Sequence, residues 1–196
     1  MVAWGRHDDA ETAVGRILDA AGRVHLRKGV RATTMADVAG EAGCSRATLY
    51  LYFANRGELR AAVRNRAALH VAQRIVDQLD PDLAVAERIT TAAVLALDLV
   101  RSSPELMVWF DEADAGLTHE LATSSEVISA IAIGLTDGAE PTATTRLGAR
   151  LLVRIIVSYL MTPDAENERP AIAQLVNGIY ATPPARPDTR SEEPAS

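Results

Sequence analysis

The chain has 196 residues, of which 48% are hydrophobic and 4% aromatic, so it can bury a core of ordinary size. Its apolar content is mostly Ala, Leu, Val and Ile, a mixture that favours helices, and its formal charge of −6 argues against nucleic-acid binding by the whole surface. One cysteine excludes an internal disulfide framework, and neither a signal-peptide pattern nor an apolar run of roughly 18 residues is present. These totals predict an all-α, cytoplasmic protein that has no contact with membranes.

The charge is unevenly distributed along the chain. Residues 1–70 contain 11 Lys and Arg against 7 Asp and Glu, a net charge of +4, whereas residues 71–196 carry −10. A basic N-terminal part is the pattern expected when only that part meets a polyanion. Solvated faces can produce a split of this size by chance, so charge alone does not decide.

Two helices with clear start and stop signals are expected first. An apolar stripe over residues 14–24 lies on one helical face, and Gly29 follows as a C-terminal cap. Thr34-x-x-Asp37 has the spacing of a capping box, with Asp in place of the usual Glu. It predicts a short second helix through “MADVAGEA” that ends at Gly43.

The stretch “SRATLYLYF”, residues 45–53, alternates and is rich in aromatics, which alone favours a strand. It lies between an N-cap at Ser45 and a second N-cap signal, Asn55-x-x-Glu58. A lone strand there would have no partner to pair with. We therefore expect a short helix, followed by a long linking helix over about residues 56–79.

Three helices joined by a tight Ala-Gly-Cys turn between the second and third describe a helix-turn-helix. Val38 and Leu49 would point into a small core, which leaves the third helix free to lie in a DNA major groove. On that helix Arg46 is the forked donor suited to guanine edges, and the hydroxyls of Thr48 and Tyr50 can reach phosphates. The pattern predicts double-stranded DNA as a partner.

Residues 16–59, “RILDAAGRVHLRKGVRATTMADVAGEAGCSRATLYLYFANRGEL”, closely resemble the N-terminal domain of the TetR family of bacterial transcriptional regulators. The resemblance runs through the Lys-Gly of the first helix, “TT” with “VA”, the “AG” of the turn, “TLY” with “YF”, and N-R-x-x-L. It implies a two-domain, all-α homodimer that binds a palindromic operator and releases it when a small molecule binds. The DNA-contacting positions that it implies are Thr33, Thr34, Ser45, Arg46, Ala47, Thr48, Tyr50, Tyr52 and Arg56.

Two positions depart from the family's pattern. Leu51 stands where members often have a polar or aromatic residue, and it could pack on a thymine methyl instead. Arg56-Gly57 replaces the common Lys and acidic residue, and Arg keeps the charge that binds phosphate. Tyr50 and Tyr52 have an alternative role as cover for a helix junction.

Three further residues of this segment are expected to be buried. Leu49 and Phe53 should belong to the core of the small domain. Cys44 lies near the N-terminus of the third helix, where it could act as a redox sensor or serve as a buried filler. We favour the filler, because the family often has a small apolar residue there.

The rest of the chain continues in helices, in which Pro104 and Pro170 should occupy first helical positions. The Pro-rich segment 182–196 is expected to be disordered. The expected domains are residues 1–58, here called the head, and residues 80–181, here called the body. The expected body helices are 83–102, 104–115, 119–136, 142–162 and 170–181.

The helix over 142–162 is apolar over a broad arc and needs two neighbours. A partner subunit is a natural second neighbour, and the alternative is an internal core helix. With the last helix it could form a four-helix dimer seam, which the resemblance also implies. The candidate interface residues are Leu151, Leu152, Ile155, Ile156, Leu175 and Ile179.

The stretch “ELMVWFDEADAG”, residues 105–116, is the best candidate for a small-molecule pocket. Its aromatic pair can line an apolar cavity, and acidic or imidazole groups can anchor polar atoms. An inward carboxylate would favour a cationic ligand, and the alternative is that the pair belongs to an ordinary core. The candidate lining residues are Met107, Trp109, Phe110, Asp111, His119 and Tyr159.

No pattern indicates an enzyme, a metal site or a cofactor. The four histidines are dispersed, and no serine lies in a nucleophile elbow. The “DEAD” at 111–114 lacks the phosphate-binding loop of a helicase, since the only lysine is Lys28 in “LRKGV”. We therefore expect a ligand-responsive transcriptional repressor. The alternative is a dimeric small-molecule binding protein whose head contacts a protein partner.

Overall fold

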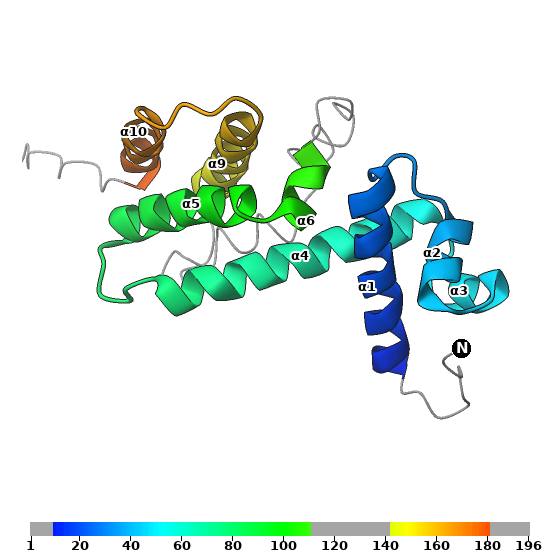
Figure 1. Cartoon of the computed structure of the whole chain (residues 1–196). Helices are drawn as coiled ribbons and strands as arrows, with labels where there is room; N and C mark the ends of the chain where they lie inside the picture. The colour runs from blue at the N-terminus through cyan, green and yellow to red at the C-terminus, as the bar shows by residue number, and fades with distance from the viewer. Residues whose placement is uncertain (1–9, 111–141, 181–196) are drawn as a thin grey trace, which may run out of the picture.

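Helices make up the part of the chain that the structure, a computed structural model, describes: residues 10–110 and 142–180 (Figure 1). The all-α prediction is confirmed. No helix in these two ranges is long and apolar enough to span a bilayer. The expected helix at 119–136 and the segment 182–196 lie outside the described residues. The elements are α1 (Ala10–Lys28), α2 (Met35–Ala42), α3 (Arg46–Tyr52), α4 (Arg56–Gln78), α5 (Val85–Arg101), α6 (Pro104–Met107), the 3-10 helix η1 (Val108–Phe110), α9 (Ala143–Met161) and α10 (Glu168–Tyr180).

Helix α2 begins and ends at the residues that its sequence signals predict. The Asp37 N–H donates to Thr34 Oγ1 at 3.2 Å, and the Thr34 N–H donates to Asp37 Oδ2 at 3.0 Å, which closes the capping box. Gly43 ends the helix with φ at 71°, and the Cys44 N–H donates to Ala39 O at 3.0 Å. Because glycine has no Cβ, this left-handed turn leads tightly into α3.

The stretch 45–53 is helical through Tyr52, so the helix prediction is confirmed over the strand-like alternation. Ser45 Oγ accepts from the Thr48 N–H at 3.0 Å, and Asn55 Oδ1 accepts from the Glu58 N–H at 2.9 Å. These side-chain oxygens satisfy donors that a helix start leaves without partners. Local capping therefore sets the boundaries of α3 and α4.

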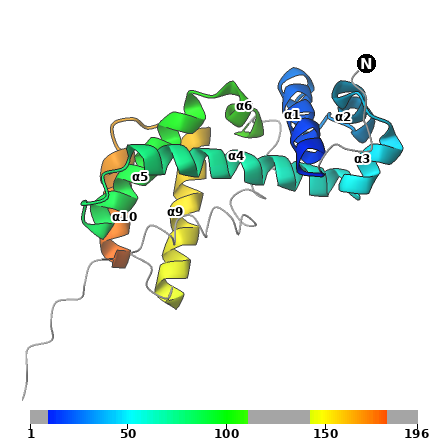
Figure 2. The same cartoon turned by 90° about the horizontal axis from the view of Figure 1, so that it is seen from below.

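One long helix, α4, connects the head to the body. Helices α1, α2 and α3 gather at one end of α4, whereas α5, α9 and α10 lie toward its other end (Figures 1 and 2). Both residues predicted to be core in “SRATLYLYF” are buried, Leu49 at 0% and Phe53 at 5% exposure. The buried residues that form the head core include Ile17, Leu18, Val30, Val38, Leu49, Phe53, Leu59 and Val63, together with Trp109 from η1.

The body packs α5 against α9 and α10 around its own core. Pro104 occupies the first turn of α6, as predicted, but the described part of the expected helix 104–115 changes to 3-10 geometry at Val108. The Val-Trp-Phe sequence of η1 has low helix propensity, and Trp109 is turned into the head core. The buried body-core residues are Ile89, Ala93, Leu97, Leu152, Leu160, Ile172 and Val176.

A charged pair joins the end of α5 to the start of α10. Arg101 donates to both carboxylate oxygens of Glu168, at 2.8 and 2.5 Å, and to the carbonyl of Tyr159 at 2.8 Å. Hydrogen bonding from Arg101 lowers the pKa of Glu168. The expectation that Pro170 is the first helical residue is wrong, because α10 begins at Glu168. Pro170 still lies in the first turn, where backbone N–H groups have no intrahelical acceptor.

Candidate nucleic-acid interface and effector cavity

The exposed side of α3 carries the side chains that sequence reasoning assigned to DNA. Arg46 and Ala47 are exposed, Tyr50 is 43% exposed and Leu51 is 83% exposed. Among the described residues, no hydrogen bond or ion pair engages Arg46. Leu51 is the most exposed of the large apolar side chains in the described residues, so a partner surface that covers it would gain apolar burial. The geometry therefore leaves a forked cation, a phenol and an apolar side chain available for one partner.

Hydroxyl groups at the two ends of α3 are more restrained. The hydroxyls of Ser45 and Thr48 lie 2.8 Å apart and share a hydrogen bond, so both are held at the helix N-terminus. Tyr52 is half-buried and packs against the head core. The junction-covering interpretation therefore fits Tyr52 better than Tyr50.

Two predicted contacts, Thr33 and Arg56, meet at the loop that leads into α2. Thr33 is buried, and its hydroxyl donates to Gly29 O at 2.8 Å. Arg56 is exposed, and its Nη1 donates to Arg31 O at 3.0 Å and Thr33 O at 3.4 Å. A guanidinium has five N–H donors, so these two bonds do not use all of them. Arg56 thus ties the start of α4 to this loop, while Thr33 braces the loop from inside.

Acidic residues of α2 engage three cations of α1. Glu41 pairs with Arg23 at 2.6 Å and with Arg27 at 2.5 Å, and Asp37 pairs with Lys28. The hydrogen bond from Lys28, followed by those from Thr34, lowers the pKa of Asp37 to about 2. These ion pairs hold α1 against α2 and partly neutralise the basic charge of the head.

The Cys44 thiol has the environment of a packed side chain. It is partly buried against the head core, and burial raises its pKa. A raised pKa leaves less of the reactive thiolate at neutral pH. This environment favours the filler interpretation over a redox sensor.

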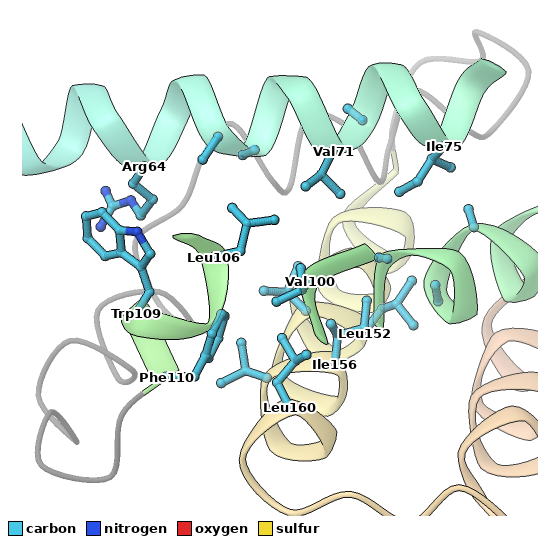
Figure 3. A pocket seen from close by; sticks show the side chains of 18 of the residues that line it. Arg64, Val71, Ile75, Val100, Leu106, Trp109, Phe110, Leu152, Ile156 and Leu160 are labelled. Carbon is cyan, nitrogen blue, oxygen red and sulfur yellow. The ribbon is translucent and has the colours of Figure 1, made fainter. Parts of the chain in front are cut away.

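A cavity of about 410 Å³ lies between α4, α5, η1 and α9 (Figure 3). Of the candidate pocket residues, Trp109 and Phe110 line it, whereas Met107 and Tyr159 are absent from its lining and pack against the body core. Asp111 and His119 lie outside the described residues. Sequence reasoning missed the walls that α4, α5 and α9 supply. Their described members are Arg64, Ala67, Ala68, Val71, Ala72, Ile75, Val76, Ile89, Ala92, Ala93, Ala96, Val100, Leu152, Val153, Ile156, Val157 and Leu160, with Leu106 from α6.

Trp109 contacts both the cavity and the head. Its ring lines the cavity, is 4% exposed, and meets the His25 ring of α1 edge-on, with ring centroids 5.3 Å apart and planes at 87°. Burial, with a smaller effect of the positive charge on Arg60, lowers the pKa of His25 to about 4. A neutral, buried imidazole is therefore packed on the residue that forms the cavity wall.

The predicted dimer residues divide between the inside and the outside of the body. Leu152 is buried and lines the cavity, as does the half-buried Ile156, because this side of α9 faces α4 and α5. Leu151 is 36% exposed and Leu147 is 57% exposed. The other candidates, Ile155, Leu175 and Ile179, are half-buried.

Comparison with known proteins identifies the family. Residues 17–63 match the model of the bacterial regulatory proteins of the tetR family. An uncharacterized HTH-type transcriptional regulator of Mycobacterium tuberculosis, Rv1255c, is 36% identical over 177 residues, which cover 88% of each chain. The chain belongs to the TetR family of transcriptional regulators. The resemblance of residues 16–59 is thereby confirmed, and TetR-family proteins act by binding DNA through the helix-turn-helix, not as enzymes.

Solved structures of TetR-family proteins share the fold. A TetR transcriptional regulator from Rhodococcus sp. RHA1 is 19% identical, with 89% of this chain and 99% of that chain covered at a TM-score of 0.66. FadR from Bacillus subtilis, solved in complex with stearoyl-CoA, is 18% identical, with 84% and 94% covered at a TM-score of 0.55. At these identities the likeness establishes the TetR-like arrangement of head and body helices alone.

Proposed function

We propose that this TetR-family regulator is a cytoplasmic repressor that binds a palindromic operator as a homodimer and releases it when a small molecule fills the cavity. In this proposal residues 1–58 read DNA, and residues 80–181 bind the effector and the partner subunit. The observation that carries the proposal is the double contact of Trp109, which lines the cavity and packs against His25 of the head.

The proposed DNA contacts centre on α3 in the major groove. Arg46 would donate to a guanine edge, with Ala47 and Leu51 against thymine methyls and Tyr50 on a phosphate. The exposure of all four side chains supports these roles. The remaining candidates would lie at the edge of the DNA interface, where they would contact phosphates or hold the reading helix and its loops in position. They are Thr33, Thr34, Ser45, Thr48, Tyr52 and Arg56.

The proposed dimer contact uses the outer side of α9 together with α10. Exposed leucines at 147 and 151 on one helix face are typical of a surface that another subunit covers. Ile155, Leu175 and Ile179 would extend the seam from their half-buried positions. Leu152 and Ile156 line the cavity on the opposite side of α9, so they would support the dimer contact only indirectly, by positioning α9.

Release of DNA would follow from a shift between two arrangements of the dimer. An effector that fills the cavity pushes on Trp109, and the His25 contact transmits the displacement to α1 and the reading helix. Reading helices that no longer match major grooves about 34–36 Å apart bind the operator less tightly. The stearoyl-CoA complex of FadR supports the idea that a protein of this fold can bind a small molecule.

Two substitutions in the head test the DNA-binding part of this proposal. Binding of a selected operator duplex is measured by fluorescence anisotropy over a range of salt concentrations. Arg46→Ala should relax the base preference at one position in each half-site, whereas Arg56→Ala should weaken all sequences alike and reduce the salt dependence. A uniform loss in both variants would contradict the role given to Arg46. Wild-type affinity that is insensitive to salt would favour a protein partner for the head.

A further inference from the structure

We propose that the cavity binds an elongated hydrocarbon chain that ends in an anionic group, such as a long-chain carboxylate, with the anionic end at Arg64. The inference rests on the proposed function only in taking this cavity as the effector site. It adds the chemical class of the effector and the residue that selects it.

The cavity wall is apolar along nearly all of its described length. Of the twenty lining residues, nineteen are Ala, Val, Ile, Leu, Trp or Phe, and Arg64 alone carries a charged side chain. A ligand with hydroxyl or amide groups along its length would lose hydrogen bonds to water and find no side-chain partners among these residues except Arg64 and the indole N–H of Trp109. The wall therefore selects a molecule whose long part is hydrocarbon.

Alanines make up a large share of the lining, which follows α4 over several turns. Helix α4 contributes Ala67, Ala68 and Ala72 to the lining and α5 contributes three more alanines, of which Ala92 shares a buried cluster with Ile75 of α4. Along α4 the lining extends from Arg64 to Val76, a span of about 18 Å at the rise of an α-helix. An extended chain fits this shape better than a compact or branched ring system does.

Arg64 supplies the preference for a charged end. It projects from α4 beside Trp109, with Val71 and Ile75 farther along the same helix (Figure 3). Its Nε atom is buried, and a guanidinium forms charge-assisted hydrogen bonds to carboxylates that are stronger than neutral ones. Arg64 also has a contact within the protein, and its five N–H donors allow a carboxylate to be added to that contact.

The placement of Arg64 suits a regulatory ligand. The preceding residue, Val63, belongs to the head core, and Trp109 meets both Arg64 in the cavity and His25 of α1. An anionic group at Arg64 therefore lies where the cavity adjoins the head. The hydrocarbon chain would extend from there into the body.

The experiment measures the affinity of the full-length protein for n-alkyl carboxylates and the matching primary alcohols, from eight to eighteen carbons, by isothermal titration calorimetry. The Kd of the carboxylates should decrease about 3–4-fold per added methylene until the chain fills the cavity. Carboxylates should bind about 10-fold or more tightly than alcohols of equal length. Arg64→Met should remove this preference and leave alcohol binding unchanged.

Two further variants locate the site. Ala68→Phe places a large side chain in the cavity and should abolish binding of both carboxylates and alcohols. Arg74→Met, on the same helix but outside this cavity, should behave as the wild type. Circular dichroism and the melting temperature establish that each variant is folded. Alcohols that bind as tightly as carboxylates, or equal losses for both series in Arg64→Met, would overturn the ligand class but leave the effector site intact. No binding of either series to the folded protein would overturn the proposed ligand class.

Discussion

The neutral, buried state of His25 makes the stability of the head depend on pH in a calculable way. Burial and the charge of Arg60 lower the pKa of His25 from its ordinary value of 6.5 to about 4 in the folded protein. Between these values the unfolded chain binds a proton that the folded chain does not, so stability falls as pH falls. At about 1.4 kcal/mol per pKa unit, lowering the pH from 7.5 to 5.0 should remove roughly 2 kcal/mol of unfolding free energy through His25 alone.

The matched variant is His25→Phe, which keeps an aromatic ring against Trp109 and removes the titrating group. Urea unfolding of both proteins at pH 7.5 and 5.0, at one fixed protein concentration, isolates this contribution because all other groups titrate alike. The wild type should lose about 2 kcal/mol more than the variant over this range. Equal losses in the two proteins would refute the neutral, buried assignment of His25.

Two predictions concern the body, both measured as unfolding free energy by chemical denaturation. Glu168→Gln should cost about 3 kcal/mol, because it leaves the partly buried Arg101 without its carboxylate, and a cost under about 0.5 kcal/mol would contradict that pairing. Gly148→Ala should cost about 1–3 kcal/mol, since the new methyl would lie 2.6 Å from Ile179 Cγ2. Gly178→Ala, whose methyl meets no atom within 4 Å, should be neutral or stabilising, and equal effects would disprove the close approach of α9 to α10.

The head could be predicted in detail because its signals are local. Thr34, Ser45 and Asn55 each cap a helix by bonding a backbone N–H three residues ahead, and such spacing is visible in sequence. The caps at Ser45 and Asn55 also show that the alternating stretch between them is a helix and not a strand. Once α3 is taken as a helix, its period places Leu49 on the side that faces the core.

The cavity could not be predicted, because its walls come from helices that are far apart in the chain. The alanines of α4 and α5 look like ordinary helix formers, and only packing brings them to face each other across an open space. The sequence likewise does not reveal that Leu152 faces inward while Leu151 faces out, since α9 is apolar over a broad arc. The bracing role of Arg56 likewise depends on a hydrogen bond from its side chain to the backbone carbonyl of Arg31, which is distant in sequence.

Selection from a random duplex library tests the central claim most directly. Purified dimeric protein is incubated with the library at low salt, and the retained sequences are determined. The account predicts an enriched inverted repeat whose half-site centres lie about 34–36 Å apart or a multiple of this distance. Failure of folded, dimeric protein to enrich any sequence, with and without long-chain carboxylates present, would contradict the assignment of α3 as a reader of operator DNA.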